Sequence, residues 1–427
     1  MGKKKYEPET YWELRSIAQE EAVKQRADSK LNVLAKSYKQ AERYLTSEIK
    51  KIYDSFIRRT GTTDEEVARL MQENAEPSVF VELGQMAKTI ENKEVSDQVA
   101  AYLTKLSVKG RVTRLEQMKA KAYVTAKQVA DKQMRDMTDF YVEEIYNRHD
   151  ETVVEAEMIK LEQEIDEQFP KNNKLYSVND DKIEIEVWSD KIKKPVEVID
   201  VADELKNTKI KGLTTRQVQN VLDTRWVGSN YSKRIWNDTD KLAARLQELF
   251  TVEKLTGMSE DEMARAIAKE FDTNLYVAKR LIRTEANFIT GQAQLKAWKE
   301  RGIEHYILVV TLDLRTSEIC KAKDEEQKVY KVEEAIVNGE KGNYPPFHPW
   351  CRTVVRAYFG KRTLRTVRTA NDPITRETFV ITNGTKYSEW ENELIKRHSK
   401  ETIAKAKKEI RRANARNNKR LIEQKVG

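Results

Sequence analysis

Apolar residues recur at steps of three and four over long stretches of this chain, which predicts a mainly helical protein. Between residues 31 and 56 they alternate with Lys, Glu and Gln, the spacing of an amphipathic helix. The apolar positions are Leu31, Leu34, Tyr38, Ala41, Leu45, Ile49, Ile52 and Phe56. The same pattern continues with few breaks, so residues 1–165 are expected to form a helical N-terminal domain.

The hydrophobic period changes from helical to alternating after residue 166. Residues Ile183–Trp188 alternate apolar and acidic side chains, and a second apolar run follows Pro195 at Val196 and Val198. Alternation of this kind is typical of half-buried strands. Residues 166–212 are therefore expected to form a connector that contains β-structure.

Helical periodicity resumes at about residue 213 and then gives way to short strands. Ser259 and Glu262 form an S-x-x-E capping box, which predicts a helix start at Ser259. A further helix is expected from about Thr273 to Gly302.

The run Tyr306–Val310 then alternates like a strand, with Val329–Tyr330 and Thr353–Tyr358 as candidate partners. The predicted fold class is mainly α, with a small α+β module of short antiparallel strands around residues 305–358. The module is assigned to residues 213–360, and residues 361–427 form a C-terminal extension.

The charge of the chain is concentrated in its last residues. The 427 residues hold 78 Lys and Arg against 70 Asp and Glu, a net charge of +8. Residues Lys396–Lys425 hold 12 basic and three acidic side chains, a charge of +9, so the remainder sums to −1. The basic character is therefore a property of one segment.

This basic tail is a candidate nucleic-acid-binding segment. It contains no aromatic residue, so contact with DNA would involve the phosphate backbone and depend strongly on salt. The alternative is a solvated helix or chain end, as charge runs usually are. The candidate phosphate-binding residues are Lys405, Lys407, Lys408, Arg411, Arg412, Arg416, Lys419 and Arg420.

Several classes of protein are disfavoured by what the sequence lacks. No apolar run approaches the ~18–20 residues that a membrane-spanning helix needs. The N-terminus lacks the apolar region of a secretory signal, which favours the cytoplasm. Phosphate-binding loops, G-x-S-x-G elbows and H-E-x-x-H helices are missing from the sequence. These absences favour a non-enzymatic protein.

Both cysteines belong to the one constellation with metal-binding character. His348 and Cys351 form an H-x-x-C pair, and Ser317 and Cys320 form an S-x-x-C pair. Thiolates and imidazoles are the ligands that zinc prefers, but a serine hydroxyl rarely completes a structural site. No cofactor is therefore predicted: the thiols are expected to be small buried apolar groups, and structural zinc on Cys320, His348 and Cys351 is the alternative. A Cys–His nucleophile is the third option, although no orienting group or oxyanion hole is indicated.

Glu285 stands beside Arg283 in a helical pattern and resembles a catalytic acid at first sight. Ion pairs between Arg and Glu on a helix are more often structural. We therefore expect Arg283 and Glu285 to belong to a structural network, and we assign no catalytic residue.

A series of ordered motifs resembles the phage head morphogenesis family, the Mu F-like minor capsid proteins. The motifs span about residues 225–358 and occur in one order. They are NYSKRIW at 230–236, GMSEDEMA at 257–264, RLIRTEA at 280–286, TLDLRTSEIC at 311–320 and YPPFHPWCRT at 344–353. Weaker similarity to minor head proteins of tailed phages extends to YWELRSIAQEEA at 11–22 and YSEWENELI at 387–395.

The resemblance implies a set of motif residues. In that family the first turn commonly reads D-x-R-T-C-x-x-C and the second H-P-x-C-R. The matching positions here are Asp313, Arg315, Thr316, Cys320, His348, Pro349, Cys351 and Arg352. Ser317 stands where the family has its first cysteine, so the implied zinc site lacks one ligand.

The resemblance also implies a function. It indicates a structural minor head protein of a tailed phage or prophage, acting at the portal vertex in procapsid assembly and in DNA packaging or delivery. The implied partners are the portal protein, capsid or scaffolding proteins and packaged DNA, with no membrane. The implied location is the virion, at the capsid interior or portal vertex. Two alternatives stay open: an enzyme, either a nuclease or a toxin-like effector using Cys or His chemistry, and a stand-alone nucleic-acid-binding protein.

Overall fold

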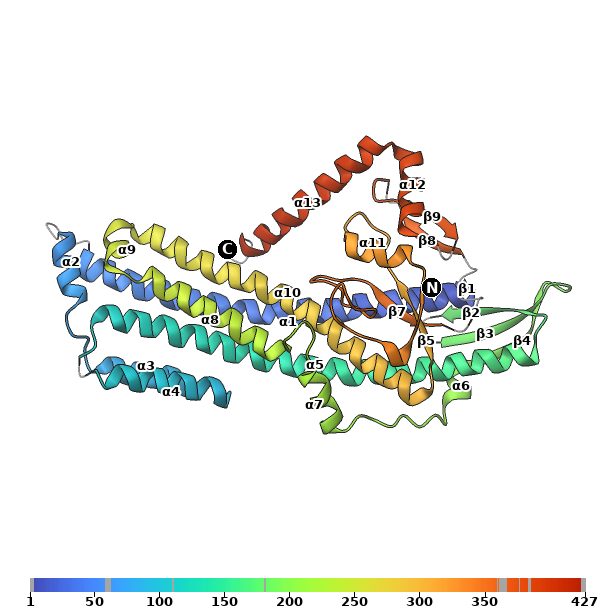
Figure 1. The fold of residues 1–427 in the computed structure, drawn as a ribbon, viewed down its shortest axis with the longest axis horizontal. Coiled ribbons are helices and arrows are strands. Elements are labelled where there is room, and N and C mark those ends of the chain that lie inside the picture. Colours follow the sequence, from blue (N-terminus) through green and yellow to red (C-terminus); the bar gives the residue numbers. More distant parts are fainter. Residues whose placement is uncertain are drawn as a thin grey trace. The chain divides into compact units, whose positions relative to one another are not determined.

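The computed structural model confirms a mainly helical fold with small antiparallel sheets (Figure 1). It describes residues 4–57, 63–109, 111–179, 182–358, 360, 367–375, 377–382 and 385–423. For residues 56–57, 367–369, 371, 378–382 and 414–423 it describes the backbone alone. Among the described residues, no helix combines the length and apolarity needed to cross a bilayer.

The chain divides into two compact units, each assembled from separate stretches of sequence. One unit comprises residues 26–140 and 229–282 and is called the helical unit below. The other comprises residues 1–25, 141–228 and 283–427 and is called the mixed unit. These units cut across the four consecutive domains expected from the sequence, because the helices α1 (Pro8–Ile52), α5 (Arg114–Gln168) and α10 (Glu260–Arg301) contribute residues to both.

The helical unit contains no strand among its described residues. Besides parts of the three long helices it holds a π-helical turn and five shorter helices. They are Tyr53–Ile57, α2 (Asp64–Met71), α3 (Ser78–Lys88), α4 (Lys93–Ser107), α8 (Tyr231–Leu249) and α9 (Val252–Gly257). Most of the helix expected over residues 31–56 is part of α1, which begins well before it at Pro8 and ends at Ile52, where the π-helical turn begins.

The capping box at Ser259 is confirmed, but the separate helix from Thr273 is wrong. Ser259 and Glu262 bond reciprocally, with the Glu262 carboxylate 2.8 Å from the Ser259 backbone nitrogen. The helix then continues without a break to Arg301. The Thr273 hydroxyl donates to the Lys269 carbonyl one turn earlier, so it bonds inside the helix and does not cap a new one.

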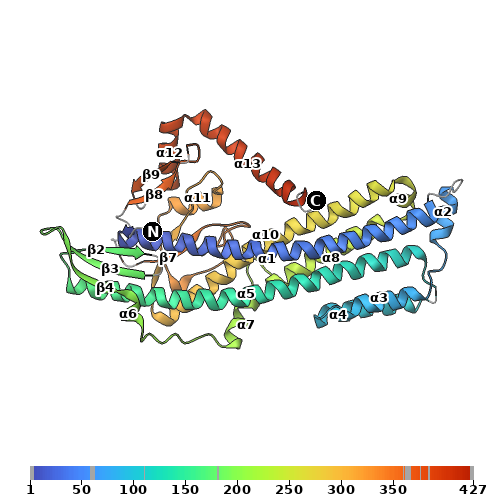
Figure 2. The same cartoon turned by 180° about the vertical axis from the view of Figure 1, so that it is seen from behind.

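The mixed unit holds all the described strands. Its first sheet has the order β1-β2-β3-β4, formed by Lys4–Tyr6, Asn173–Asn179, Lys182–Ser189 and Lys194–Asp200. The sequence predicts β3 and β4 but not β1 or β2. One face of the sheet packs on α1 and α5 through Tyr11, Met158, Ile165, Tyr176 and Ile185 (Figure 2).

The second sheet is the one expected around residues 305–358. Its order is β6-β5-β7, with β5 (His305–Val309) between β6 (Val329–Lys331) and β7 (Val354–Ala357). Both pairings are antiparallel, as predicted. The sheet packs against the end of α10 through Trp298, Tyr306 and Tyr344.

The mixed unit contains further elements besides these two sheets. They are α6 (Val201–Leu205), α7 (Thr215–Asp223), α11 (Glu318–Glu325), a 3-10 turn at Val332–Glu334, β8 (Val367–Asn371), β9 (Thr378–Thr382), α12 (Tyr387–His398) and α13 (Lys400–Glu423). Trp390 and Leu394 of α12 and Ile403 of α13 share one buried cluster. Within its described residues the basic tail therefore comprises the end of α12 and the helix α13, whose apolar side chains Ile403, Ala406 and Ile410 pack in a cluster with α12.

Candidate functional site

The turn after β5 is organised around the carboxylate of Asp313. Its Oδ1 accepts hydrogen bonds from the backbone nitrogen of Arg315 at 2.8 Å and from the Thr316 hydroxyl at 3.3 Å. Such bonds from an Asp side chain to the backbone two residues on are a common way to close a turn. Asp313 therefore fixes the shape of its own loop.

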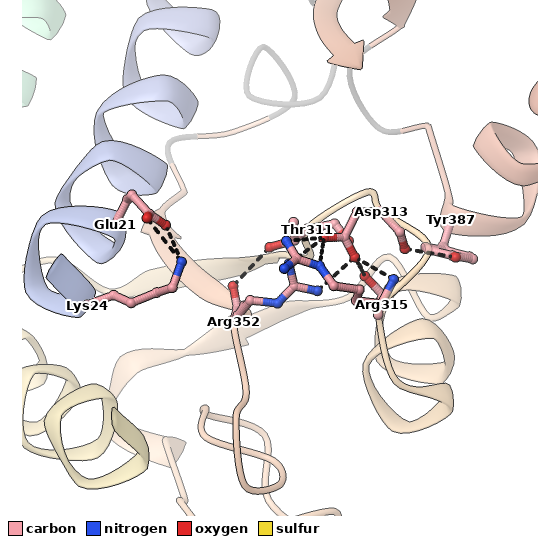
Figure 3. Close-up of polar contacts among 8 residues, drawn as sticks. Glu21, Lys24, Thr311, Asp313, Arg315, Arg352 and Tyr387 are labelled. Atoms are coloured by element: carbon pink, nitrogen blue, oxygen red, sulfur yellow. Dashed lines mark hydrogen bonds and ion pairs between the residues drawn. The ribbon is translucent and has the colours of Figure 1, made fainter. Parts of the chain in front are cut away.

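Two arginines from different parts of the chain also bind the Asp313 carboxylate (Figure 3). Arg352, which follows Cys351, forms a bidentate pair with Asp313, with Nη2 2.7 Å from Oδ1 and Nη1 bonded to Oδ2. The Arg315 Nε lies 3.2 Å from Oδ2. Burial alone would raise the pKa of Asp313, but the hydrogen bonds and charge of Arg352 outweigh it and lower that pKa.

This network also holds the start of α12. The Tyr387 hydroxyl donates to the Asp313 carbonyl at 3.0 Å, and the Tyr387 backbone nitrogen donates to the buried carboxylate of Asp324 at 2.6 Å. Lys321 lies over the Tyr387 ring, 4.6 Å from its centroid. The sequence does not indicate the contact of Tyr387 with Asp324, although Tyr387 begins the motif YSEWENELI, because two residues so far apart along the chain give no local signal of their contact.

The second turn, His348–Pro349–Trp350–Cys351, places its histidine beside both thiols. The Cys351 backbone nitrogen donates to the His348 carbonyl at 3.1 Å, and Trp350 has a φ of +64°. Proline followed by a left-handed residue is the pattern of a type II turn, in which the second position favours glycine. This turn brings the His348 ring to Cys320, where the Nε2–Sγ distance is 3.1 Å.

Cys320, His348 and Cys351 form one compact donor cluster. Their ligand atoms all lie within 4.8 Å of one another, and the two sulfurs are 3.8 Å apart. Ser317 contributes its hydroxyl, 2.7 Å from His348 Nε2, and it also caps α11 by accepting from the Cys320 nitrogen at 3.2 Å. The structure thus brings together all three sequence-predicted metal ligands and the serine.

The protonation of this cluster is strongly shaped by its internal hydrogen bonds. The Cys351 thiol above all, with His348, Ser317 and Thr353, lowers the pKa of Cys320 to about 4. Burial and the neighbouring Cys320 raise the pKa of Cys351. The pKa of His348 is raised because its bond to Cys320 outweighs its burial.

The donor set fits a zinc ion. The His348 Nδ1 lies 2.7 Å from the Pro349 carbonyl oxygen, so that nitrogen carries the proton and Nε2 is turned toward the sulfurs. A second hydrogen bond of this kind orients most metal-binding histidines. Two sulfurs and one imidazole leave one tetrahedral position, for which Ser317 or water is available.

Helix α10 supports the second turn. The Thr284 hydroxyl accepts from the Trp350 backbone nitrogen at 3.2 Å, and the Arg283 guanidinium lies 5.2 Å from the Trp350 ring centroid. The buried Glu285 accepts from the Trp226 indole at 3.2 Å. Arg283 and Glu285 thus each contact a tryptophan. The sequence does not indicate these contacts, because its spacing reveals only pairing along the helix.

The candidate phosphate-binding residues lie on α13. Lys405, Lys408, Arg411 and Arg412 are exposed, whereas Lys407 is half-buried and pairs with Glu391 of α12. The side chains of Arg416, Lys419 and Arg420 lie outside the described residues. Lys407 is therefore the one member of the described group that an intrachain partner already neutralises.

Comparison with known proteins identifies one family over the region that holds both turns. Residues 244–356 match the family model described as phage Mu protein F like protein. This confirms the resemblance that the sequence motifs indicated. No curated protein and no solved structure matches the chain.

Proposed function

We propose that this chain, which carries a phage Mu protein F like region, is a structural minor head protein acting at the portal vertex during procapsid assembly and DNA packaging or delivery. The match over residues 244–356 supports a role in phage head morphogenesis and carries the proposal. The motif residues support it further, because Asp313, Arg315 and Arg352 pair with one another inside the chain. A carboxylate bound in this way suits a structural role.

Quantitative mass spectrometry of full and DNA-free particles, normalised to the portal protein, tests the proposal. A few copies per portal in both particle classes are expected. Depletion from emptied particles would indicate in addition that the chain leaves the particle with the DNA. Absence from procapsids and virions alike would contradict a minor head protein and favour one of the other classes, such as a nuclease or toxin-like effector.

We also propose that Cys320, His348 and Cys351 hold a structural zinc ion that ties the two turns together. The compactness of the cluster and the orientation of His348 support this assignment. Elemental analysis of protein purified without chelator should give about one zinc per chain. Cys351→Ser should abolish the zinc and Ser317→Ala should keep it. Well under one zinc in the unaltered chain would contradict the assignment.

The exposed basic side chains of α13 are proposed to contact DNA phosphates. Fluorescence anisotropy with duplex DNA should show affinity that falls steeply with salt. The logarithm of the binding constant falls linearly with the logarithm of the salt concentration. Replacing Lys405, Lys408, Arg411 and Arg412 together by Gln should make this slope shallower by about 0.9 for each phosphate that is no longer neutralised. The matched control replaces four exposed lysines elsewhere by Gln, namely Lys191, Lys206, Lys209 and Lys211. Equal slopes in the two variants would contradict a role for α13.

A further inference from the structure

The strand β4 forms one outer edge of the first sheet of the mixed unit. Within the described part of the chain, the only strand that pairs with β4 is β3. The hairpin that joins these two strands extends beyond the end of α5 in both views (Figures 1 and 2). Five consecutive residues of β4, from Lys194 to Val198, are exposed. The edge of such a strand presents backbone donors and acceptors to which another strand can bond.

Exposed apolar side chains lie along this edge. Ile192 in the hairpin turn is 59% exposed, and Val196 and Val198 in β4 are 46% and 48% exposed. The apolar cluster between the sheet and the helices α1 and α5 includes only Ile199 from β4. Branched side chains are suited to cross-strand contacts. The valines of β4 are therefore available for contact with a strand of another molecule.

The charges of the segment from residue 191 to residue 204 are sorted by sign. Three basic residues come first and four acidic residues follow, namely Lys191, Lys193 and Lys194, then Glu197, Asp200, Asp203 and Glu204. The three lysines are called the lysine block below, and Asp203 and Glu204 of α6 are called the acid block. All five side chains are exposed, and none of them has an ion-pair partner among the described residues. Two copies of such a segment attract each other when they run antiparallel, because each basic half then meets an acidic half.

We propose that β4 pairs antiparallel with β4 of a second copy of this chain, so that the first sheets of two mixed units become one sheet. Pairing centred on Glu197 sets Val196 opposite Val198 of the second copy and Lys194 opposite Asp200, and it brings the lysine block beside the acid block. A two-fold axis makes each of these contacts occur twice. Glu197 then faces its own counterpart, which is a like-charge contact at the centre of the pairing. This inference goes beyond the proposed function, which assigns nothing to this sheet.

The lysines and the proline of this edge determine which strand it accepts. Such residues usually protect an edge strand from pairing with unrelated strands. Pro195 has no N–H, so the ladder is expected to begin after it. The lysine block disfavours a neutral or basic strand, whereas the acid block of a second copy neutralises it, so the same lysines select a second copy. An edge contact of about five residues is expected to bury less than the ~1,200 Å² of a stable interface, and the dimer should therefore dissociate on dilution.

Sedimentation velocity of the full chain from about 1 to 200 µM tests the proposal. In low salt the sedimentation coefficient should rise with concentration to that of a dimer, and high salt should reduce this rise. One variant replaces the lysine block by Glu, and a second variant replaces the acid block by Lys. Each variant alone should stay monomeric, because its two blocks then carry the same sign. An equimolar mixture should dimerise, because each block of one variant again meets a block of opposite sign on the other.

Two further variants test the specificity and the register of the pairing. Glu197→Gln removes the repulsion at the centre and should tighten the dimer severalfold. The matched control, which should dimerise like the unaltered chain, replaces three exposed lysines elsewhere by Glu, namely Lys88, Lys105 and Lys341. Thermal melting shows that each variant retains its fold.

Three results would overturn the proposal. The first is an unaltered chain that stays monomeric at every concentration. The second is a mixture of the two charge-reversed variants that does not dimerise although both are folded. The third is a dimer that Glu197→Gln leaves unchanged or weakens, because that result contradicts the register.

Discussion

Asp313 and Glu162 are two carboxyl groups of the mixed unit with opposite surroundings. Asp313 is held by two arginines and has a lowered pKa, whereas Glu162 is held by the Trp12 indole and the Tyr176 hydroxyl and has a raised pKa. The first carboxylate is compensated within the chain, while the second has no counter-charge among the described residues. A fully paired carboxylate is thus expected to stabilise the fold, and an uncompensated buried one is expected to destabilise it when ionised.

The largest expected effect is the loss of stability when the charge of Asp313 is removed. Asp313→Asn keeps the shape of the side chain but leaves Arg315 and Arg352 without their anion. We expect unfolding to become easier by about 2 kcal/mol, since charged groups partly removed from water lose their partner.

Chemical denaturation of the full chain measures the effect of Asp313→Asn. The control Glu318→Gln removes a carboxylate that is 86% exposed and, among the described residues, forms an ion pair with Lys321 alone. Exposed ion pairs contribute little to stability, so the free energy of unfolding of the control should equal that of the unaltered chain. Equal stability of both variants would show that the Asp313 network does not hold the turns.

The pH dependence of stability should differ in sign between the two carboxyl groups. Glu162 titrates at about 7 in the folded chain against an ordinary value of 4.5, so folding takes up a proton between these pH values. Its contribution to stability is present below pH 4.5 and is lost as the pH rises to about 7. Asp313 has a lowered pKa, so its contribution is present above the ordinary Asp range and is lost in acid.

Melting temperatures of the unaltered chain, Glu162→Gln and Asp313→Asn between pH 3 and 8 test both signs. The melting temperature of Glu162→Gln should rise relative to that of the unaltered chain between pH 5 and 7. The difference by which Asp313→Asn melts below the unaltered chain should become smaller below pH 4. A pH-independent difference for Glu162→Gln would mean that its carboxyl group is compensated after all.

The smallest expected effect concerns the support of the second turn by α10. Arg283→Met keeps most of the apolar stem but removes the cation over the Trp350 ring. We expect a loss of about 0.5–1 kcal/mol, which is usual for an accessible cation–π contact. The same denaturation experiment measures it, with Lys299→Met, an exposed cation of the same helix, as the control. A larger loss of stability from Lys299→Met than from Arg283→Met would contradict this role of Arg283.

The sequence predicts the elements that depend on the spacing of nearby residues. It does not predict features that depend on contacts between residues far apart along the chain. Alternation at Tyr306–Val310 and the capping box at Ser259 are local, and both are found in the structure. The helix break expected at Thr273 is wrong because a hydroxyl can bond back into a helix as readily as it can cap one.

The same distinction applies to the sites. The ordered motifs are enough to group Asp313 with Cys320 and His348 with Cys351 and Arg352, although Cys320 lies in α11 and not in a turn. The contacts of Glu162 could not be foreseen, because they combine α1, α5 and β2. Nothing in the spacing of Trp12, Glu162 and Tyr176 indicates that they meet.

Cross-linking mass spectrometry of procapsids tests most directly whether the chain acts at the portal vertex. The exposed Lys171 and Lys191 of the mixed unit are suitable attachment points for an amine-reactive cross-linker. We expect repeated cross-links from this chain to the portal protein, at a few copies per portal. Cross-links confined to the major capsid protein over the whole shell, or none to any head protein, would contradict a role at the portal vertex.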